Sequence, residues 1–180
     1  QNLTGIWPKK VVNYKTVMSD AASGFTSVTY PFPVIRMADL YLMYAEALNE
    51  KGEDYATVLP WIDMVRERSG LQGVKESWDQ YVGNSKYATQ TGLRQIIMQE
   101  RRIELAFEGH YFWDVRRWKT ATTELTQPLT GWKVRYGETD VDYYSENLVL
   151  VRDFTPKMYF WPIDIGELRK DPNLVQNYGW

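Results

Sequence analysis

Two neighbouring stretches of the chain, residues 35–51 and 54–69, carry hydrophobic residues at helical spacing. The first stretch has two apolar lines, one of Ile35, Ala38, Leu42 and Ala45 and one of Met37, Tyr41, Tyr44 and Leu48. A helix that is apolar over most of its circumference packs against neighbours on more than one side. Gly52 is a typical helix end, and about three residues join the two stretches. The pattern therefore predicts two helices that pack as an antiparallel pair.

The second stretch has its apolar positions at Ala56, Leu59, Ile62, Met64 and Val65, and Gly70 ends it. Pro60 lies inside this pattern, so it must either kink the helix or lie in its first turn. The pair has the length of one tetratricopeptide-type unit, in which small residues such as Ala45 and Ala56 let the two helices approach closely.

Further helices are predicted in the middle of the chain and near its end. Thr91 is a plausible N-cap for a helix over 92–108, Gly109 interrupts it, and a fourth helix follows over 110–120. The loop over 71–90 holds a short helical piece near Glu76–Tyr81. Asp164 and Glu167 have capping-box spacing, which indicates a short last helix.

The remaining segments contain turn-forming residues and little periodicity. Residues 1–34 are predicted to be irregular, with one short strand at Val11–Tyr14. Residues 121–160 are predicted to be mostly loop, with a hairpin that uses the apolar run Leu148–Val151. The predicted fold is therefore mainly α, with tetratricopeptide-like helix pairs, long irregular loops and little β structure.

The amino-acid composition excludes several classes of protein and several kinds of site. The net charge of −2 over 180 residues argues against a nucleic-acid-binding protein. The chain has no cysteine, so thiolate nucleophiles and sulfur-ligated zinc sites are excluded. His110 is the single histidine of the sequence, so any site that needs two histidines is excluded as well. No apolar run approaches the ~18 residues that span a bilayer. No phosphate loop or dinucleotide fingerprint is present, so no cofactor is predicted.

A charged cluster on the third and fourth predicted helices admits two interpretations. Glu100 and Glu104 share a helical stripe with apolar residues, and Glu108 follows one predicted turn later. Paired carboxylates can act as general acid and base, as in glycoside hydrolysis. A di-iron site fails, because Glu104 lies six residues from His110 and the pattern needs Glu-x-x-His. We favour a structural ion-pair network over catalysis or metal binding, made of Glu100, Arg101, Glu104, Glu108, Asp114, Arg116 and Arg117.

Four blocks of the sequence resemble the SusD/RagB family. They are Ile35–Glu50, Ile62–Leu71, Glu100–Trp118 and Pro162–Trp180, in the family's order. The third block, which begins Glu-Arg-Arg-Ile-Glu-Leu-Ala-Phe-Glu-Gly-His, is the most specific. Three features depart from the usual pattern, namely Tyr111, Trp113 and the ending Gln-Asn-Tyr-Gly-Trp.

The resemblance implies a mainly α-helical binding protein rather than an enzyme. Members of this family are lipid-anchored on the outer surface of the outer membrane of Bacteroidetes. They capture glycans or other nutrients and pass them to a SusC-like TonB-dependent transporter. Because family members are considerably longer, the resemblance implies that residues 1–180 are the C-terminal part of such a protein. The start at Gln1 rather than Met agrees with a fragment or a processed product. The N-terminal part of the same protein would then be a partner that carries the anchor and much of the ligand site.

Two other functions stay open, a helical glycoside-processing enzyme that uses Glu100 and Glu104, and a helical scaffold that docks a partner. Aromatic residues are numerous, with 8 Trp, 13 Tyr and 6 Phe. Rings on helices, such as Tyr41, Tyr44, Phe107 and Trp118, are predicted to lie in the core. Ligand contacts are predicted from rings in loops, where the alternative for each is to anchor its loop. These rings are Trp7, Tyr14, Trp78, Tyr81, Tyr87, Trp132 and Tyr136.

Overall fold

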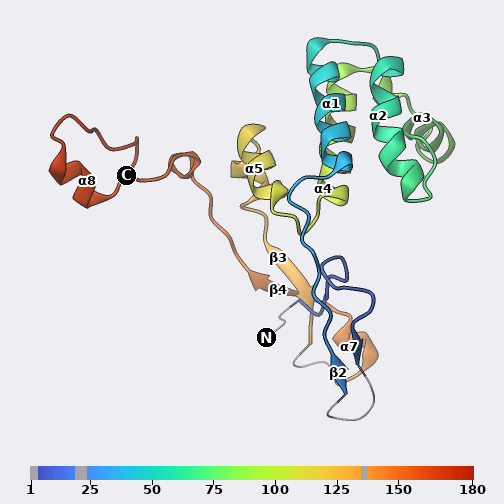
Figure 1. Ribbon diagram of the computed structural model, residues 1–180, viewed down its shortest axis with the longest axis horizontal. Coiled ribbons are helices and arrows are strands. Elements are labelled where there is room, and N and C mark those ends of the chain that lie inside the picture. The colour runs from blue at the N-terminus through green and yellow to red at the C-terminus, as the bar shows by residue number, and fades with distance from the viewer. Residues whose placement is uncertain (1–3, 19–23, 135–137) are drawn as a thin grey trace. The chain divides into compact units, whose positions relative to one another are not determined.

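The computed structural model describes residues 4–18, 24–134 and 138–180 (Figure 1). The chain divides into two compact units, residues 9–111 and residues 1–8 with 112–180, which we describe separately. The prediction of a mainly helical chain with little β structure is confirmed. Among the described residues, no helix has both the length and the apolar character needed to cross a membrane.

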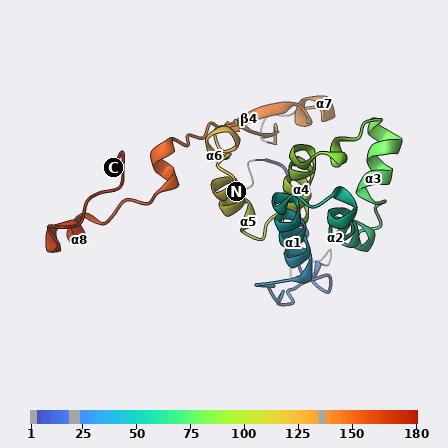
Figure 2. The same ribbon diagram turned by 90° about the horizontal axis from the view of Figure 1, so that it is seen from above.

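The unit of residues 9–111 is built on three long helices. They are α1 (Met37–Lys51), α2 (Tyr55–Arg68) and α4 (Gln90–Glu104), which lie side by side in both views (Figure 1, Figure 2). Their facing sides form one buried core, which includes Leu42, Ala45, Val58, Ile62, Leu93 and Ile97. Burial of this apolar surface, at roughly 25 cal/mol per Å², is the main source of stability for the three helices.

The antiparallel pair of α1 and α2 is confirmed. Gly52 ends α1 with a φ of 89°, and its N–H points back to the carbonyls of Asn49 and Leu48. The Asp54 carboxylate then caps α2 by accepting from the N–H of Thr57 at 2.8 Å. The start of α1 therefore lies beside the end of α2, and both ends line one groove. Pro60 lies in the second turn of α2 rather than the first, and the helix continues to Arg68.

Helix α4 begins and ends earlier than its sequence pattern suggests. Its N-cap is Thr89, not Thr91, and the Thr89 hydroxyl accepts from the N–H of Gly92 at 3.1 Å. The helix ends at Glu104, because the next five residues form turns in which Phe107 and Gly109 have positive φ. Glu108 is therefore not one helical turn beyond Glu104. Phe107 and Tyr44 are exposed, so their assignment to the core was wrong.

The N-terminal strand was also placed wrongly. Val11 and Val12 lie in an exposed turn, and the strands are β1 (Val17–Met18) and β2 (Phe25–Thr26), which pair antiparallel. Between α2 and α4 lie α3 (Val74–Ser77), a π-helical turn over Trp78–Val82 and a 3₁₀ turn over Lys86–Ala88. These short elements agree with the helical piece predicted near Glu76–Tyr81.

The unit of residues 1–8 and 112–180 contains the predicted hairpin. Strands β3 (Leu129–Trp132) and β4 (Glu146–Leu150) pair antiparallel, and α7 (Asp140–Tyr143) lies in their connection. The division between the units falls within α5 (His110–Arg117), which ends three residues earlier than predicted and precedes α6 (Ala121–Glu124). A 3₁₀ turn over Pro156–Tyr159 and α8 (Ile165–Lys170) complete the unit, and Asp164 caps α8 as predicted.

Candidate functional site

A hollow beside the β3–β4 hairpin has two aromatic walls. Trp132, the last residue of β3, and Tyr144, which follows α7, meet edge to face with ring centroids 5.7 Å apart. Tyr143 and Tyr144 also meet edge to face, with ring centroids 5.0 Å apart. The hollow has a volume of about 280 Å³. Its lining residues are Ile6, Thr130, Gly131, Trp132, Tyr144 and Glu146.

The hollow exists because an N-terminal segment runs close beside β3. The carbonyl of Thr4 accepts from the N–H of Trp132 at 3.0 Å. A Cβ atom on Gly131 would lie 2.6 Å from the Cα of Thr4, so a residue with a side chain would push that segment away. Glycine at this position therefore permits the close approach that places Ile6 in the lining.

One face of the hairpin supplies the polar groups of the hollow. Trp132 is paired with Glu146 in the register, and Thr130 lies two residues before Trp132. Residues two apart on a strand share a face, and cross-strand partners share it too. The Glu146 carboxylate has no ion pair or hydrogen bond within the described part of the chain. It is therefore available to a ligand.

The other aromatic residues predicted as ligand contacts do not gather at this hollow. Trp7, Tyr14 and Tyr81 are exposed but do not line it. Trp78 packs against the helical core, with the Lys86 ammonium 5.4 Å from its ring. Tyr136 lies outside the described residues.

The sequence analysis missed Tyr144 and Glu146, although both line the hollow. The available signal was the tyrosine pair at 143 and 144, which lies shortly before the apolar run of β4. Tyr87 is buried, and its hydroxyl donates to Asp79 at 2.8 Å, so it anchors its own loop.

The glutamates of the charged cluster are bound to basic side chains. Arg36 donates from Nε to Glu108 at 2.7 Å and from Nη1 to Glu104 at 2.5 Å. Arg68 also donates to Glu104, at 2.6 Å, and Lys10 forms an ion pair with Glu108. Both carboxylates line a polar depression of about 380 Å³ next to Arg36 and Arg68. Each glutamate therefore meets two cations.

Burial and pairing shift the pKa values of these groups in opposite directions. Burial opposes the ionisation of Glu108, but hydrogen bonds from Arg36 and Lys10 outweigh it, so its pKa lies below the ordinary value. The carboxylates of Glu108 and Glu104 in turn raise the pKa of Arg36. Burial dominates at Glu100 and raises its pKa, although its partner Arg66 acts in the opposite direction.

The other residues of the predicted network form separate groups. Arg101 pairs with Asp39 of α1 at 2.9 Å, and Arg117 pairs with Asp114 within α5 at 2.9 Å. Arg116 donates to the carbonyls of Met158 and Tyr159 and lies over the rings of Phe112, Phe154 and Trp161. The structure thus gives these residues local partners. Their structural role stays a prediction.

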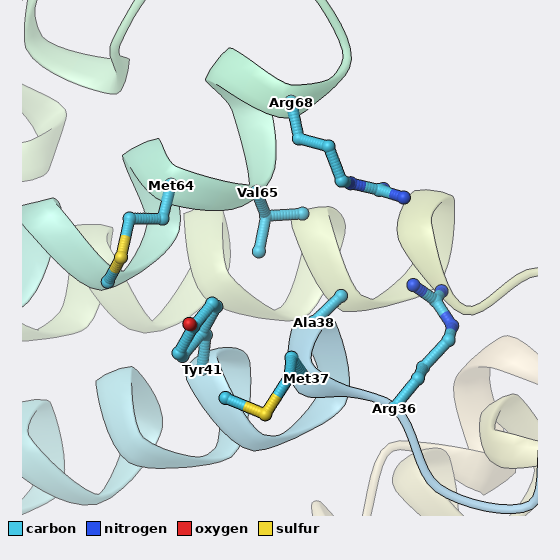
Figure 3. Close-up of a pocket in the computed structure, with 7 residues that line it drawn as sticks. All are labelled: Arg36, Met37, Ala38, Tyr41, Met64, Val65 and Arg68. Atoms are coloured by element: carbon cyan, nitrogen blue, oxygen red, sulfur yellow. The ribbon is translucent and has the colours of Figure 1, made fainter.

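A third hollow, an apolar groove of about 210 Å³, lies between the start of α1 and the end of α2 (Figure 3). Met37, Tyr41 and Met64 line it, and Arg36 and Arg68 lie at one end. Both arginines are bound to glutamates, so their charge is neutralised within the protein. Within the described residues, no group of carboxylates and histidine is arranged to hold a metal ion.

Comparison with known proteins identifies the family. A family model described as the SusD family matches residues 1–180. The chain belongs to the SusD family. Its helix pair, charged cluster and C-terminal segment are the parts in which the sequence already resembled that family.

Curated SusD relatives from Formosa agariphila align with most of the chain. SusD-like protein P25 is 39% identical over 144 residues, which are 80% of this chain and 23% of the relative. SusD-like protein P38 is 28% identical over the same length, 80% of this chain and 24% of the relative. The chain thus spans about a quarter of the length of these SusD relatives.

Solved SusD structures share the fold. A SusD-like protein from Bacteroides fragilis is 30% identical, with a TM-score of 0.67 over 86% of this chain and 28% of that one. A SusD-like carbohydrate-binding protein from the same species is 31% identical, with a TM-score of 0.65 over 83% of this chain and 29% of that one. The helical architecture is therefore a property that this chain shares with SusD proteins of known structure.

Proposed function

We propose that this chain is the C-terminal part of a cell-surface glycan-binding protein of the outer membrane. In this proposal the protein is lipid-anchored through its N-terminal part, does not catalyse a reaction, and hands its ligand to a SusC-like TonB-dependent transporter. Membership of the SusD family and likeness to a carbohydrate-binding member support it. The short span of the chain relative to its relatives supports the expectation of a larger protein.

The observation that carries the proposal is the Trp132–Tyr144 pair in the hairpin hollow. Aromatic faces bury the C–H face of a sugar ring, while polar groups at the edge bind its hydroxyls. The hollow offers both, with two rings, the Thr130 hydroxyl and the Glu146 carboxylate. None of these polar side chains is bound elsewhere in the described residues.

The proposal is tested on the full-length protein with Trp132→Ala and Tyr144→Ala. Calorimetric titration against a panel of glycans identifies the ligand, and each variant is then titrated with it. We expect each substitution to weaken binding about fivefold, since one ring contact contributes about 1 kcal/mol. Trp7→Ala and Tyr81→Ala are matched controls, because both rings are exposed outside the hollow. Wild-type affinity in both hollow variants would place the site elsewhere.

Delivery to a transporter is tested separately. The full-length protein is co-expressed with a SusC-like transporter from the same genome and purified through a tag on either partner. We expect the two to co-purify. Failure to do so, with glycan binding intact, would leave a binding protein without the delivery role.

Docking of the N-terminal part onto α1 is proposed from the outward side of this helix. Leu40 and Met43 are exposed there, one turn apart on the same helix. The enzyme alternative is less well supported. Glu100 has a raised pKa, as a general acid needs, but its carboxylate is bound to Arg66 and partly buried.

A further inference from the structure

We infer that the hairpin hollow selects uncharged sugars against anionic ones, and that Glu146 is the residue that discriminates. The inference rests on the proposed function and adds a ligand class to it. Neutral hexose units are the favoured occupants, and uronate or sulfated units are rejected.

The hairpin register places Glu146 inside the sugar-binding face. Glu146 is the cross-strand partner of Trp132, and Thr130 is the partner of Leu148. All four side chains therefore share one face of the two-stranded sheet. Tyr144 lies two residues before Glu146 and closes the hollow against Trp132. A ring that stacks on the aromatic pair thus has its edge next to the Glu146 carboxylate.

Among the described residues, the lining of the hollow carries one negative charge and no positive one. The other lining residues are uncharged, so the Glu146 carboxylate makes the hollow negatively charged. They are Ile6, Thr130, Gly131, Trp132 and Tyr144. An ionised carboxylate only accepts hydrogen bonds, and its two oxygens can accept from neighbouring sugar hydroxyls. A sugar carboxylate or sulfate would instead meet a like charge and would find no cation to pair with.

The size of the hollow fits a single unit of a glycan. The volume of about 280 Å³ lies just below the usual range for small-molecule sites. A single unit inside it cannot move its anionic substituent far from Glu146. The charge of the bound unit therefore interacts directly with the Glu146 carboxylate, whereas the rest of a long glycan lies outside the hollow.

The experiment compares matched neutral and anionic glycans on the full-length protein. The probes are dextran oligosaccharides against dextran sulfate of the same length, and galacto-oligosaccharides against oligogalacturonates. Affinities are measured by calorimetry at neutral pH for the wild type, Glu146→Gln, Glu146→Lys and Trp132→Ala. Glu138→Gln is the control, because it removes the same charge at an exposed residue outside the hollow's lining.

We expect the wild type to bind the neutral member of at least one pair at least tenfold more tightly. Glu146→Gln should reduce that ratio about tenfold, Glu146→Lys should reverse it, and Glu138→Gln should leave it unchanged. A wild type that prefers the anionic member overturns the inference. So does an unchanged ratio in Glu146→Gln, or an equal change in Glu138→Gln.

The failure of the inference is distinguishable from that of the proposed function. If Trp132→Ala weakens binding about fivefold, as one lost ring contact should, while Glu146→Gln keeps the ratio, only the charge selection is wrong. If binding is intact in Trp132→Ala, the hollow is not the sugar site, so the inference falls while glycan binding elsewhere in the protein stands. If no glycan binds, the proposed function falls and the inference falls with it.

Discussion

Arg101 and Asp39 form an ion pair inside the helical core, with Nη1 of the arginine 2.9 Å from Oδ1 of the aspartate. Their side chains are only 3% and 9% exposed. The pair joins α4 to α1 although the two residues are 62 positions apart in the chain. Both residues belong to the sequence blocks that resemble the SusD family. A charged residue of one block therefore binds a charged residue of another in the folded chain.

The first prediction concerns this pair. Asp39→Asn removes the negative charge and leaves Arg101 buried beside a neutral amide. We expect a loss of about 3–5 kcal/mol in the free energy of unfolding, because breaking a buried ion pair by neutralising one partner is costly. Urea denaturation followed by circular dichroism measures it.

Glu50 and Arg94 provide the control for that experiment. They pair between the same two helices, but both side chains are well exposed. Glu50→Gln should cost less than about 1 kcal/mol. Equal effects of Asp39→Asn and Glu50→Gln would show that burial does not determine the strength of these pairs.

The second prediction separates a structural from a catalytic role for Glu104. Glu104→Ala leaves Arg36 and Arg68 without their shared carboxylate. We expect the melting temperature to fall by several degrees, as for a loss of about 2–3 kcal/mol in a chain of this size. Differential scanning calorimetry measures this change. A variant of unchanged stability that loses turnover of a glycoside would instead favour the enzyme alternative.

The third prediction follows from the lowered pKa of Glu108. Burial raises the pKa of Glu108, but the hydrogen bonds from Arg36 and Lys10 lower it by more than burial raises it. In the folded protein this pKa therefore lies below its ordinary value of 4.5. As the pH falls, Glu108 therefore binds a proton at a higher pH in the unfolded chain than in the folded protein. The stabilisation is complete above about pH 4.5 and is lost as the pH falls through the lowered pKa.

Glu108→Gln tests this dependence. Unfolding free energies of the wild type and the variant are compared between pH 7 and pH 3. The wild type should be more stable at pH 7, and the difference should shrink steadily below pH 4.5. A constant difference across the range would mean that the ionised carboxylate does not contribute.

The fourth prediction concerns the glycine in β3. Gly131→Ala places a methyl group 2.6 Å from the Cα of Thr4, so the N-terminal segment must move away from the strand. We expect a loss of about 1–3 kcal/mol in stability and weaker glycan binding, since Ile6 leaves the lining. Thermal unfolding and calorimetry measure the two effects. Thr130→Ala is the control, because it alters the same strand without this contact, and an equal loss of stability there would contradict the explanation.

Local patterns predicted the helices well and their ends less well. Recurrence of apolar residues every 3.6 residues depends only on neighbours in the chain. The bounds of α1 and α2 were therefore predicted to within two residues. The end of α4 was missed because apolar spacing continues to Phe107, whereas the backbone turns after Glu104. The exposure of Phe107 and Tyr44 was missed because a stripe does not say which neighbour, if any, covers it.

The amino-acid order alone was sufficient for the SusD family, the mainly helical class, the helix pair and the identity of the charged residues. Only the folded chain decided which partners they bind. Arg36 meets Glu104 and Glu108 across 68 and 72 residues, and Arg101 binds Asp39 across 62 residues. The hollow, too, needs the hairpin register and the approach of Thr4 to Gly131. Periodicity reports local geometry, whereas such contacts arise when distant segments pack, and packing depends on the shape of all the surfaces that meet.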